Sequence, residues 1–204
     1  MAARGTLGDL VRRLRGRPLG LGGLIGAGFF ICVAVIGPWI APADPFALGA
    51  AALQPPGRGH WLGTDDLGRD LLSGVLYGAR VSLLVGLAAA GGAVLIGVTV
   101  GAVAGYWRGR LDEVLMRVTE WVLVVPQFLI VLVVAAIFGA DLRLVVIVLA
   151  LCGWPTAARL TRAQFLALGD REFVVAARGL GASDARIIGR QILPNALPPI
   201  VVAG

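Results

Sequence analysis

Few residues of this 204-residue chain are of types that carry out catalysis. All 18 basic residues are arginines, so the chain by itself offers no lysine for a Walker A loop or a Schiff base. His60 is the only histidine, which excludes a zinc site or a catalytic triad that needs several histidines. Cys32 and Cys152 lie in apolar segments and are expected to pack there rather than form a disulfide. We therefore expect no catalytic residue, metal site or bound cofactor, and no enzyme activity.

The residues that form a recognisable pattern lie in one stretch, residues 171–195, where arginines, apolar residues and glycines are interleaved. The spacing predicts two short helices, near 163–178 and near 184–192, joined at a glycine in the left-handed conformation. Such a folded loop is more than a simple connector needs. Gly179 or Gly181 is expected to end the first helix. Ser183 is expected to cap the second, with Asp184 in its first turn and Arg190 near its end, and Pro194 is expected to stop it.

The composition shows what must position this loop. Hydrophobic residues make up 58% of the chain and charged residues 15%, whereas a soluble domain carries about 25% charged residues. Three uncharged runs can cross a hydrocarbon core of about 30 Å, and a fourth reaches that length if Asp141 and Arg143 lie at the interface. Continuous runs exclude a β-barrel, so we predict an all-α, polytopic membrane protein. The uncharged runs are 18–43, 81–107, 121–140 and 144–158.

The distribution of arginine predicts the orientation. Fourteen of the 18 arginines fall in the segments 1–17, 108–120 and 159–197. The positive-inside rule places these segments in the cytoplasm, with the N-terminus inside. The first run is expected to remain as a membrane helix, although residues 41–43 resemble a signal-peptide cleavage site. Whether residues 1–43 are ever removed stays open.

Residues 44–80 are then the longest external connection. Thr64 is expected to cap a helix, with Asp65 and Asp66 in a first turn where the helix dipole favours negative charge. Apolar residues follow at helical spacing up to Leu76. We expect a short amphipathic helix on the outer membrane surface.

Small residues recur every fourth position along the second membrane helix. Such a stripe lets helix backbones approach closely, and it extends over about 24 Å of helix. The stripe predicts a close-packed interface, but leaves open whether the partner helix belongs to this chain or to another. Its members are Ala89, Ala93, Gly97, Gly101 and Gly105.

Two prolines interrupt the later runs. Pro126 and Pro155 are expected to kink their helices. Gln127 either lines a pathway or makes an interhelical hydrogen bond. The centres of the apolar runs carry no charge, which argues against a proton relay or an ion-coupled site.

Residues 171–195 resemble the EAA loop of permease subunits in ATP-binding-cassette importers. The family pattern is Glu-Ala-Ala, three residues, Gly, nine residues, Ile, one residue, Leu-Pro. Val175 replaces the glutamate and Gln191 the isoleucine, while Glu172, one turn before Val175, is placed to supply the lost charge. The matching residues are Ala176, Ala177, Gly181, Leu193 and Pro194.

Other segments are similar to the dipeptide, oligopeptide and nickel branch of that family. They are Leu62–Asp70, Tyr77–Ser82, Gly153–Leu160, Gly181–Ser183 and Ile192–Asn195. Together they cover nearly the whole chain.

This resemblance implies the type I importer permease fold, here with four transmembrane helices and the start of a fifth. The implied organisation is a cytoplasmic tail (1–17), a first transmembrane helix (18–43), a periplasmic loop (44–80) and the transmembrane domain (81–204). The implied location is the bacterial inner membrane. The implied partners are two ATPase subunits that bind ATP and Mg²⁺, a second permease, a substrate-binding protein and membrane lipid, but no nucleic acid.

The resemblance also implies roles for particular residues. Residues 182–192 would dock into the ATPase, with Ile187 and Ile188 as apolar anchors and Arg186 and Arg190 as charges at the rim. The coupling residues are Glu172, Ala176, Ala177, Gly179, Gly181, Ser183, Asp184, Arg186, Ile187, Ile188, Arg190, Leu193 and Pro194. The residues assigned to helix packing are Gly97, Gly101 and Gly105.

Members of this family have two more helices after the loop, whereas residues 198–204 would form only about 10 Å of helix. We therefore expect a C-terminally truncated permease for di- or oligopeptides. Two alternatives stay open: an importer subunit for another solute such as nickel, and a truncated relic or scaffold that transports nothing.

Overall fold

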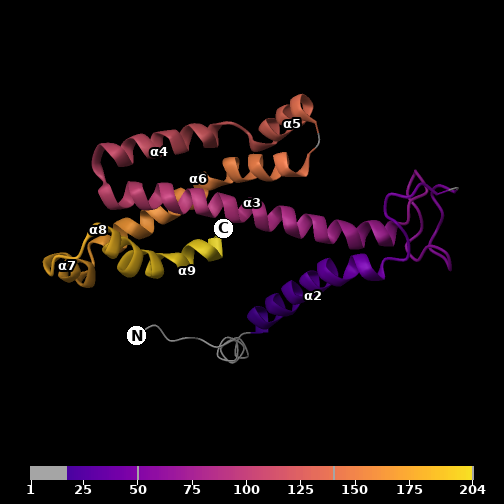
Figure 1. Cartoon of the computed structure of the whole chain (residues 1–204), viewed down its shortest axis with the longest axis horizontal. Helices are drawn as coiled ribbons and strands as arrows, with labels where there is room; N and C mark the ends of the chain where they lie inside the picture. Colours follow the sequence, from indigo (N-terminus) through magenta and orange to yellow (C-terminus); the bar gives the residue numbers. More distant parts are fainter. Residues whose placement is uncertain (1–17, 50, 140, 204) are drawn as a thin grey trace. The chain divides into compact units, whose positions relative to one another are not determined.

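The computed structural model describes residues 18–49, 51–139 and 141–203, and helices dominate them (Figure 1). The chain divides into two compact units, residues 1–84 and residues 85–204. Helix α3 (Leu71–Trp107) begins in the first unit and continues into the second. Because the placement of one unit relative to the other is not determined, each is described by itself.

The first unit consists of helix α2 (Pro18–Ile40), an irregular segment and the first turns of α3. The only extended pairing among the described residues is an isolated bridge between Thr64 and Asp70. The hydroxyl of Thr64 accepts a hydrogen bond from the Gln54 amide (2.8 Å) and donates to the Ala51 carbonyl (3.1 Å). Thr64 therefore stabilises the loop.

The helix expected to begin at Thr64 begins instead at Leu71. Asp65 forms a turn, because its carboxylate accepts the backbone amides of Leu67 and Arg69 at 2.9 and 2.8 Å. Asp70 is the residue that caps α3, accepting the Ser73 amide at 2.8 Å. The expected short surface helix is therefore not separate: its residues are the first turns of the 37-residue α3.

The second unit contains the remaining helices. They are residues 85–107 of α3, α4 (Gly109–Val124), α5 (Gln127–Phe138), α6 (Leu142–Gly169), α7 (Glu172–Gly179), α8 (Asp184–Arg186), the π-helix η1 (Ile187–Ile192) and α9 (Leu193–Ala203). The helix expected over 163–178 is interrupted, because α6 ends at Gly169 and α7 starts at Glu172.

Among the described residues, three helices, α2, α3 and α6, are long and apolar enough to cross a bilayer. A fourth span exists if α4 and α5, which are bent by 72° at Val125 and Pro126, form one crossing. Pro126 thus breaks its helix, as predicted, whereas α6 continues through Pro155. The polytopic, all-helical class is confirmed.

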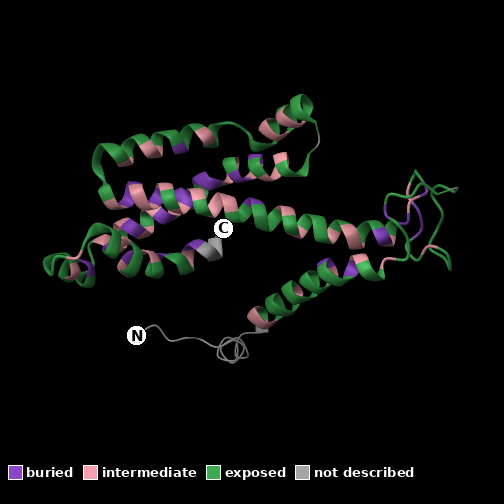
Figure 2. Ribbon diagram, viewed as in Figure 1, coloured by how far each residue is buried: buried purple, intermediate pink, exposed green. Residues whose placement is uncertain are grey.

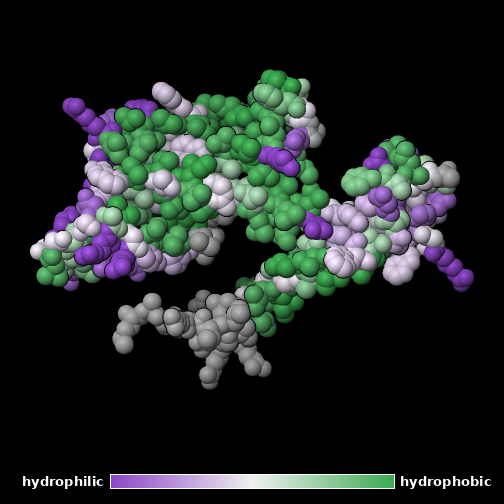
Figure 3. Space-filling model, viewed as in Figure 1, coloured by the Kyte–Doolittle hydropathy of each residue, from purple (hydrophilic) through white to green (hydrophobic). Residues whose placement is uncertain are grey.

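The core of the second unit lies where the segment after α6 packs against α6. Figure 2 shows buried residues on α6, α7 and α9. Residues of α3 pack against this core. Much of the unit's outer surface is apolar (Figure 3), as lipid-facing helices require. The core residues are Phe165, Val174, Ile187, Ile192, Ala196 and Ile200.

Candidate functional site

The stripe of small residues on α3 packs against α6 of the same chain. A Cβ atom on Gly97 would lie 2.5 Å from the Cβ of Ala157, and one on Gly105 would lie 2.7 Å from the Cβ of Phe165. Between them, a Cβ on Gly101 would lie 2.7 Å from that of Thr161. The open question of which helix forms the interface is therefore answered: α6 does, and only glycine permits this approach. We call the contact of Gly97, Gly101 and Gly105 with α6 the helix seam.

Gly181 forms the joint in the predicted docking loop. Its φ is +77°, a conformation that favours glycine. The Gly181 amide donates to the Arg178 carbonyl at 3.0 Å, and the Ala182 amide to the Ala177 carbonyl at 3.1 Å. These two bonds form a Schellman motif with Gly181 at the residue after the helix cap. Of the two glycines considered, Gly181 makes the joint, while Gly179 is the last residue of α7.

The second part of the loop begins at Ser183, which occupies the N-cap position of α8 but makes no side-chain cap bond. The predicted stop at Pro194 is wrong, since the chain passes from the π-helix η1 directly into α9. Proline has no amide hydrogen to donate. Directly before Pro194 the helix widens to a π-turn, in which the Leu193 amide bonds to the Ile188 carbonyl five residues earlier.

The loop has an inner and an outer face. Ile187 is 0% exposed and packs in the core of the second unit, and Ile188 is half-buried against it. The expectation that Ile187 anchors a partner is therefore wrong in this conformation, since its side chain faces the chain's own core. Leu180, by contrast, is 89% exposed. Leu180 is not among the predicted coupling residues. Of those residues, Ala177 and Leu193 are half-buried, and the exposed ones are Glu172, Ala176, Gly179, Gly181, Ser183, Asp184, Arg186, Arg190 and Pro194.

Polar side chains that sequence reasoning missed connect this loop to α3. The Tyr106 hydroxyl donates to Asp184 Oδ1 at 2.5 Å, and Arg108 Nη2 donates to Asp170 Oδ1 at 2.8 Å. The only signal in the sequence is their position, at the end of the uncharged run 81–107. Their partners lie 78 and 62 residues further along the chain.

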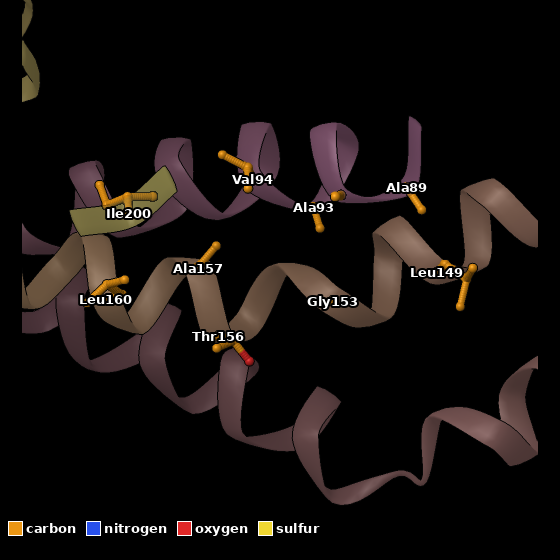
Figure 4. Close-up of a pocket in the computed structure, with 10 residues that line it drawn as sticks. Ala89, Ala93, Val94, Leu149, Gly153, Thr156, Ala157, Leu160 and Ile200 are labelled. Atoms are coloured by element: carbon orange, nitrogen blue, oxygen red, sulfur yellow. The ribbon is translucent and has the colours of Figure 1, made fainter. Parts of the chain in front are cut away.

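An apolar recess of about 290 Å³ lies between α3 and α6 (Figure 4). Ala89 and Ala93 of the stripe line it, together with Gly153 and Thr156 of α6 and Ile200 of α9. Its walls are almost entirely aliphatic. The recess suits apolar packing and offers no group for catalysis.

In the first unit, Asp70 organises the irregular segment between α2 and α3. Asp70 Oδ1 lies 3.0 Å from His60 Nδ1, and Oδ2 accepts bonds from the amide and the hydroxyl of Ser73, both at 2.8 Å. Burial raises the pKa of Asp70, but the bonds from Ser73 and His60 outweigh burial, so the pKa lies below its usual value. The Ser73 hydroxyl also accepts the Ala43 amide at 3.1 Å, which links the end of α2 to α3.

Several helices long enough to span a membrane, a glycine seam between two of them and a folded loop after α6 define a polytopic, all-helical membrane protein. Residues 97–203 match the family described as the binding-protein-dependent transport system inner membrane component. The chain belongs to this family. Residues 6–56 match the N-terminal transmembrane domain of oligopeptide transport permease C.

Three relatives show how far the similarity extends. The dipeptide transport system permease protein DppC of Bacillus subtilis (strain 168) is 39% identical over 195 residues, which cover 95% of this chain and 61% of that protein. The oligopeptide transport system permease protein OppC of the same strain is 36% identical, over 95% of this chain and 64% of that protein. A putative peptide transport system permease protein of Brucella suis biovar 1 (strain 1330) is 43% identical over 84% of this chain and 58% of that protein. The chain thus spans less than two thirds of each.

Proposed function

We propose that this chain is a transmembrane permease subunit of an ATP-binding-cassette importer that moves di- or oligopeptides across a bacterial cytoplasmic membrane. The observation that carries the proposal is the two-faced build of the loop 171–195. Its inner face packs into the core beside the helix seam, and its outer face is exposed. When a partner binds and displaces a folded element of this kind, the displacement is transmitted to the membrane helices. The family and the peptide-transport names of the relatives support the proposal.

The outer face of the loop supplies the docking surface for an ATPase subunit. Leu180 is its most exposed large apolar side chain, and Val175 on α7 is 55% exposed. Buried apolar anchors surrounded by polar groups are typical of interfaces. We therefore assign the apolar anchor to Leu180 in place of Ile187, with Arg186 and Arg190 as charges at the rim.

The proposed partners supply what this chain lacks. Two ATPase subunits bind ATP and Mg²⁺ and drive the cycle, because this chain has no lysine for a phosphate-binding loop. A second permease subunit completes the pathway, and an extracytoplasmic binding protein delivers the peptide. Nucleic acid is not a partner, and the apolar surface in Figure 3 is covered by lipid.

In the proposed orientation the N-terminus and the loop 171–195 are cytoplasmic, which the arginine distribution supports. A labelling experiment tests this. The two natural cysteines are replaced by serine, and a single cysteine is placed at Ala185 or at Leu53, both exposed. An impermeant maleimide added outside intact cells should label only the Leu53→Cys variant. Labelling of Ala185→Cys from outside would contradict the orientation.

Transport itself is tested in vesicles that contain the chain with its co-purified partners, a binding protein and a radiolabelled dipeptide. ATP-dependent uptake is expected, and Leu180→Glu should abolish ATPase co-purification. The matched control is Leu197→Glu, because Leu197 on α9 is also exposed but lies outside the docking surface. A chain that purifies alone, or hydrolyses ATP with partners without moving the peptide, would contradict the proposal. Uptake of Ni²⁺ in place of the dipeptide would correct the solute.

A further inference from the structure

Tyr106, in the last turn of α3, and Arg108, in the turn that follows α3, hold both ends of the segment 170–184, which contains α7. Tyr106 donates its hydroxyl hydrogen to Asp184 Oδ1 at 2.5 Å. Arg108, two residues further on, donates to Asp170 Oδ1 at 2.8 Å. Because Asp170 precedes α7 and Asp184 follows it, the segment is closed against one end of one helix.

A third contact holds the segment near its middle. The guanidinium of Arg178, in the last turn of α7, lies 5.8 Å over the ring of Tyr106, within the range of a cation–π interaction. Tyr106, Arg108, Asp170 and Arg178 surround a small polar recess of about 140 Å³. We call these four residues and Asp184 the clasp.

The backbone at the clasp is strained. Arg108 has φ +54° and ψ −166°, a conformation that residues other than glycine rarely adopt. Such a conformation persists when the surroundings hold it. The Arg108 amide bonds to the Ala104 carbonyl at 3.1 Å, and its side chain bonds to Asp170. The turn between α3 and α4 is therefore fixed partly by the loop after α6.

We propose that Tyr106 and Arg108 are positioning residues that tether the segment 170–184 to α3, so that a displacement of the loop reaches the helix seam through Tyr106. Gly105 of the seam directly precedes Tyr106, and its approach to Phe165 fixes where the tyrosine stands. The consequence for transport rests on the proposed function, whereas the tether is a property of this chain alone.

The contacts of the tether are weak enough to break when a partner moves the loop. The Arg108–Asp170 pair is exposed, with side chains 46% and 74% accessible, and exposed ion pairs stabilise little by themselves. The Tyr106–Asp184 bond is exposed as well. The three contacts therefore set the resting position of the loop without preventing a partner from moving it.

Hydrogen exchange of the purified chain in detergent tests the tether. Tyr106→Phe keeps the ring under Arg178 and removes only the hydroxyl, and it should speed exchange of amides in residues 180–187 by about fivefold. Tyr77→Phe is the matched control, because the Tyr77 hydroxyl makes no hydrogen bond among the described residues. Arg108→Gln should speed exchange in residues 168–175, while Arg110→Gln on the exposed start of α4 should not.

A double variant shows whether the two groups act on each other. If Tyr106 tethers the loop through Asp184, then Tyr106→Phe with Asp184→Ala should exchange no faster than Asp184→Ala alone. Effects that add fully, or exchange that stays at the unmodified rate in Tyr106→Phe, would overturn the tether.

Transport is measured separately as dipeptide taken up per ATP hydrolysed in the assembled complex. Tyr106→Phe should lower this ratio several-fold while the complex stays intact, and Tyr77→Phe should leave it unchanged. Faster exchange with an unchanged ratio would overturn the positioning role. If the unmodified complex takes up no dipeptide, the proposed function fails, and the exchange experiment still decides the tether.

Discussion

Asp112 on α4 and Arg162 on α6, fifty residues apart in the chain, form a two-point ion pair. Arg162 Nε lies 2.5 Å from Asp112 Oδ1, and Nη2 lies 2.7 Å from Oδ2. The two planar groups thus meet through parallel hydrogen bonds, the geometry in which arginine differs most from lysine. Asp112 is 14% exposed, so the pair is partly shielded from water and fixes the start of α4 against α6.

Removing this pair should lower stability measurably. Asp112→Asn is expected to reduce the free energy of unfolding by about 1–2 kcal/mol, because a half-buried arginine loses a charged partner. Arg162→Lys should recover only part of the loss. Glu113→Gln, at the exposed neighbouring position, is the control. Unfolding by denaturant in detergent micelles provides the measurement, and equal effects at positions 112 and 113 would refute the role of the pair.

The helix seam predicts opposite outcomes for one substitution at two positions of α3. Gly101→Ala places a Cβ 2.7 Å from that of Thr161 and should destabilise the fold by about 1–3 kcal/mol. Gly91→Ala meets nothing within 4 Å and should be neutral or stabilising by about 0.5–1 kcal/mol, since alanine is the better helix former. Thermal unfolding of the two variants compares them directly. A Gly101→Ala variant as stable as Gly91→Ala would show that α3 and α6 are not this close.

The two glycines of the docking loop should likewise differ. Gly181→Ala forces an alanine into a left-handed conformation at a cost of roughly 1–2 kcal/mol, and should raise amide exchange at residues 179–187. Gly179→Ala replaces a helical glycine with no neighbour within 4 Å and should lower exchange slightly. If Gly179→Ala raised amide exchange and Gly181→Ala lowered it, the joint would lie at Gly179.

Burial separates the roles of Ile187 and Leu180. Ile187→Ala should cost about 2–4 kcal/mol of unfolding free energy, as for other buried isoleucines, whereas Leu180→Ala should change it by less than about 0.5 kcal/mol. In the proposed complex, Leu180→Ala should instead weaken co-purification of the ATPase subunits. If one of these substitutions both lowered the free energy of unfolding by this amount and weakened ATPase co-purification, the separation of inner and outer faces would be contradicted.

The segment between α2 and α3 should lose order in acid. The pKa of Asp70 is lowered in the folded chain, so ionised Asp70 stabilises the fold. The stability that ionised Asp70 contributes is fully present above the usual carboxyl pKa of 3.8. It is lost as the pH falls through the lower pKa that Asp70 has in the folded chain. Amide exchange near Ser73 should therefore rise in that range, and Asp70→Asn should remove this dependence on pH. Acid loosening that persists in Asp70→Asn would assign the effect to another group.

The apolar runs that can cross a membrane follow from the sequence because hydropathy is a local property of about 20 residues. The helix ends do not, since α3 begins at Leu71, before the run 81–107, and the run 121–140 is divided between α4 and α5. The stripe on α3 was visible for a similar reason, since its four-residue period lies within a single helix. Resemblance of the loop 171–195 to a known motif indicated the proposed docking element. A glycine joint was expected within that loop, but its exact position depended on the two backbone bonds at Gly181.

Contacts over long separations decided the rest. The sequence could not show that Ile187 faces inward or that Tyr106 meets Asp184, because each contact joins residues far apart in the chain. Nor could it show that Asp70 rather than Thr64 caps α3, because Asp65 forms a turn where the helix was expected to begin. Side-chain types predict what a residue can do, such as cap, anchor or pair. Only the packing of α3 against α6, with the loop folded back onto both, determines which of those interactions each residue makes.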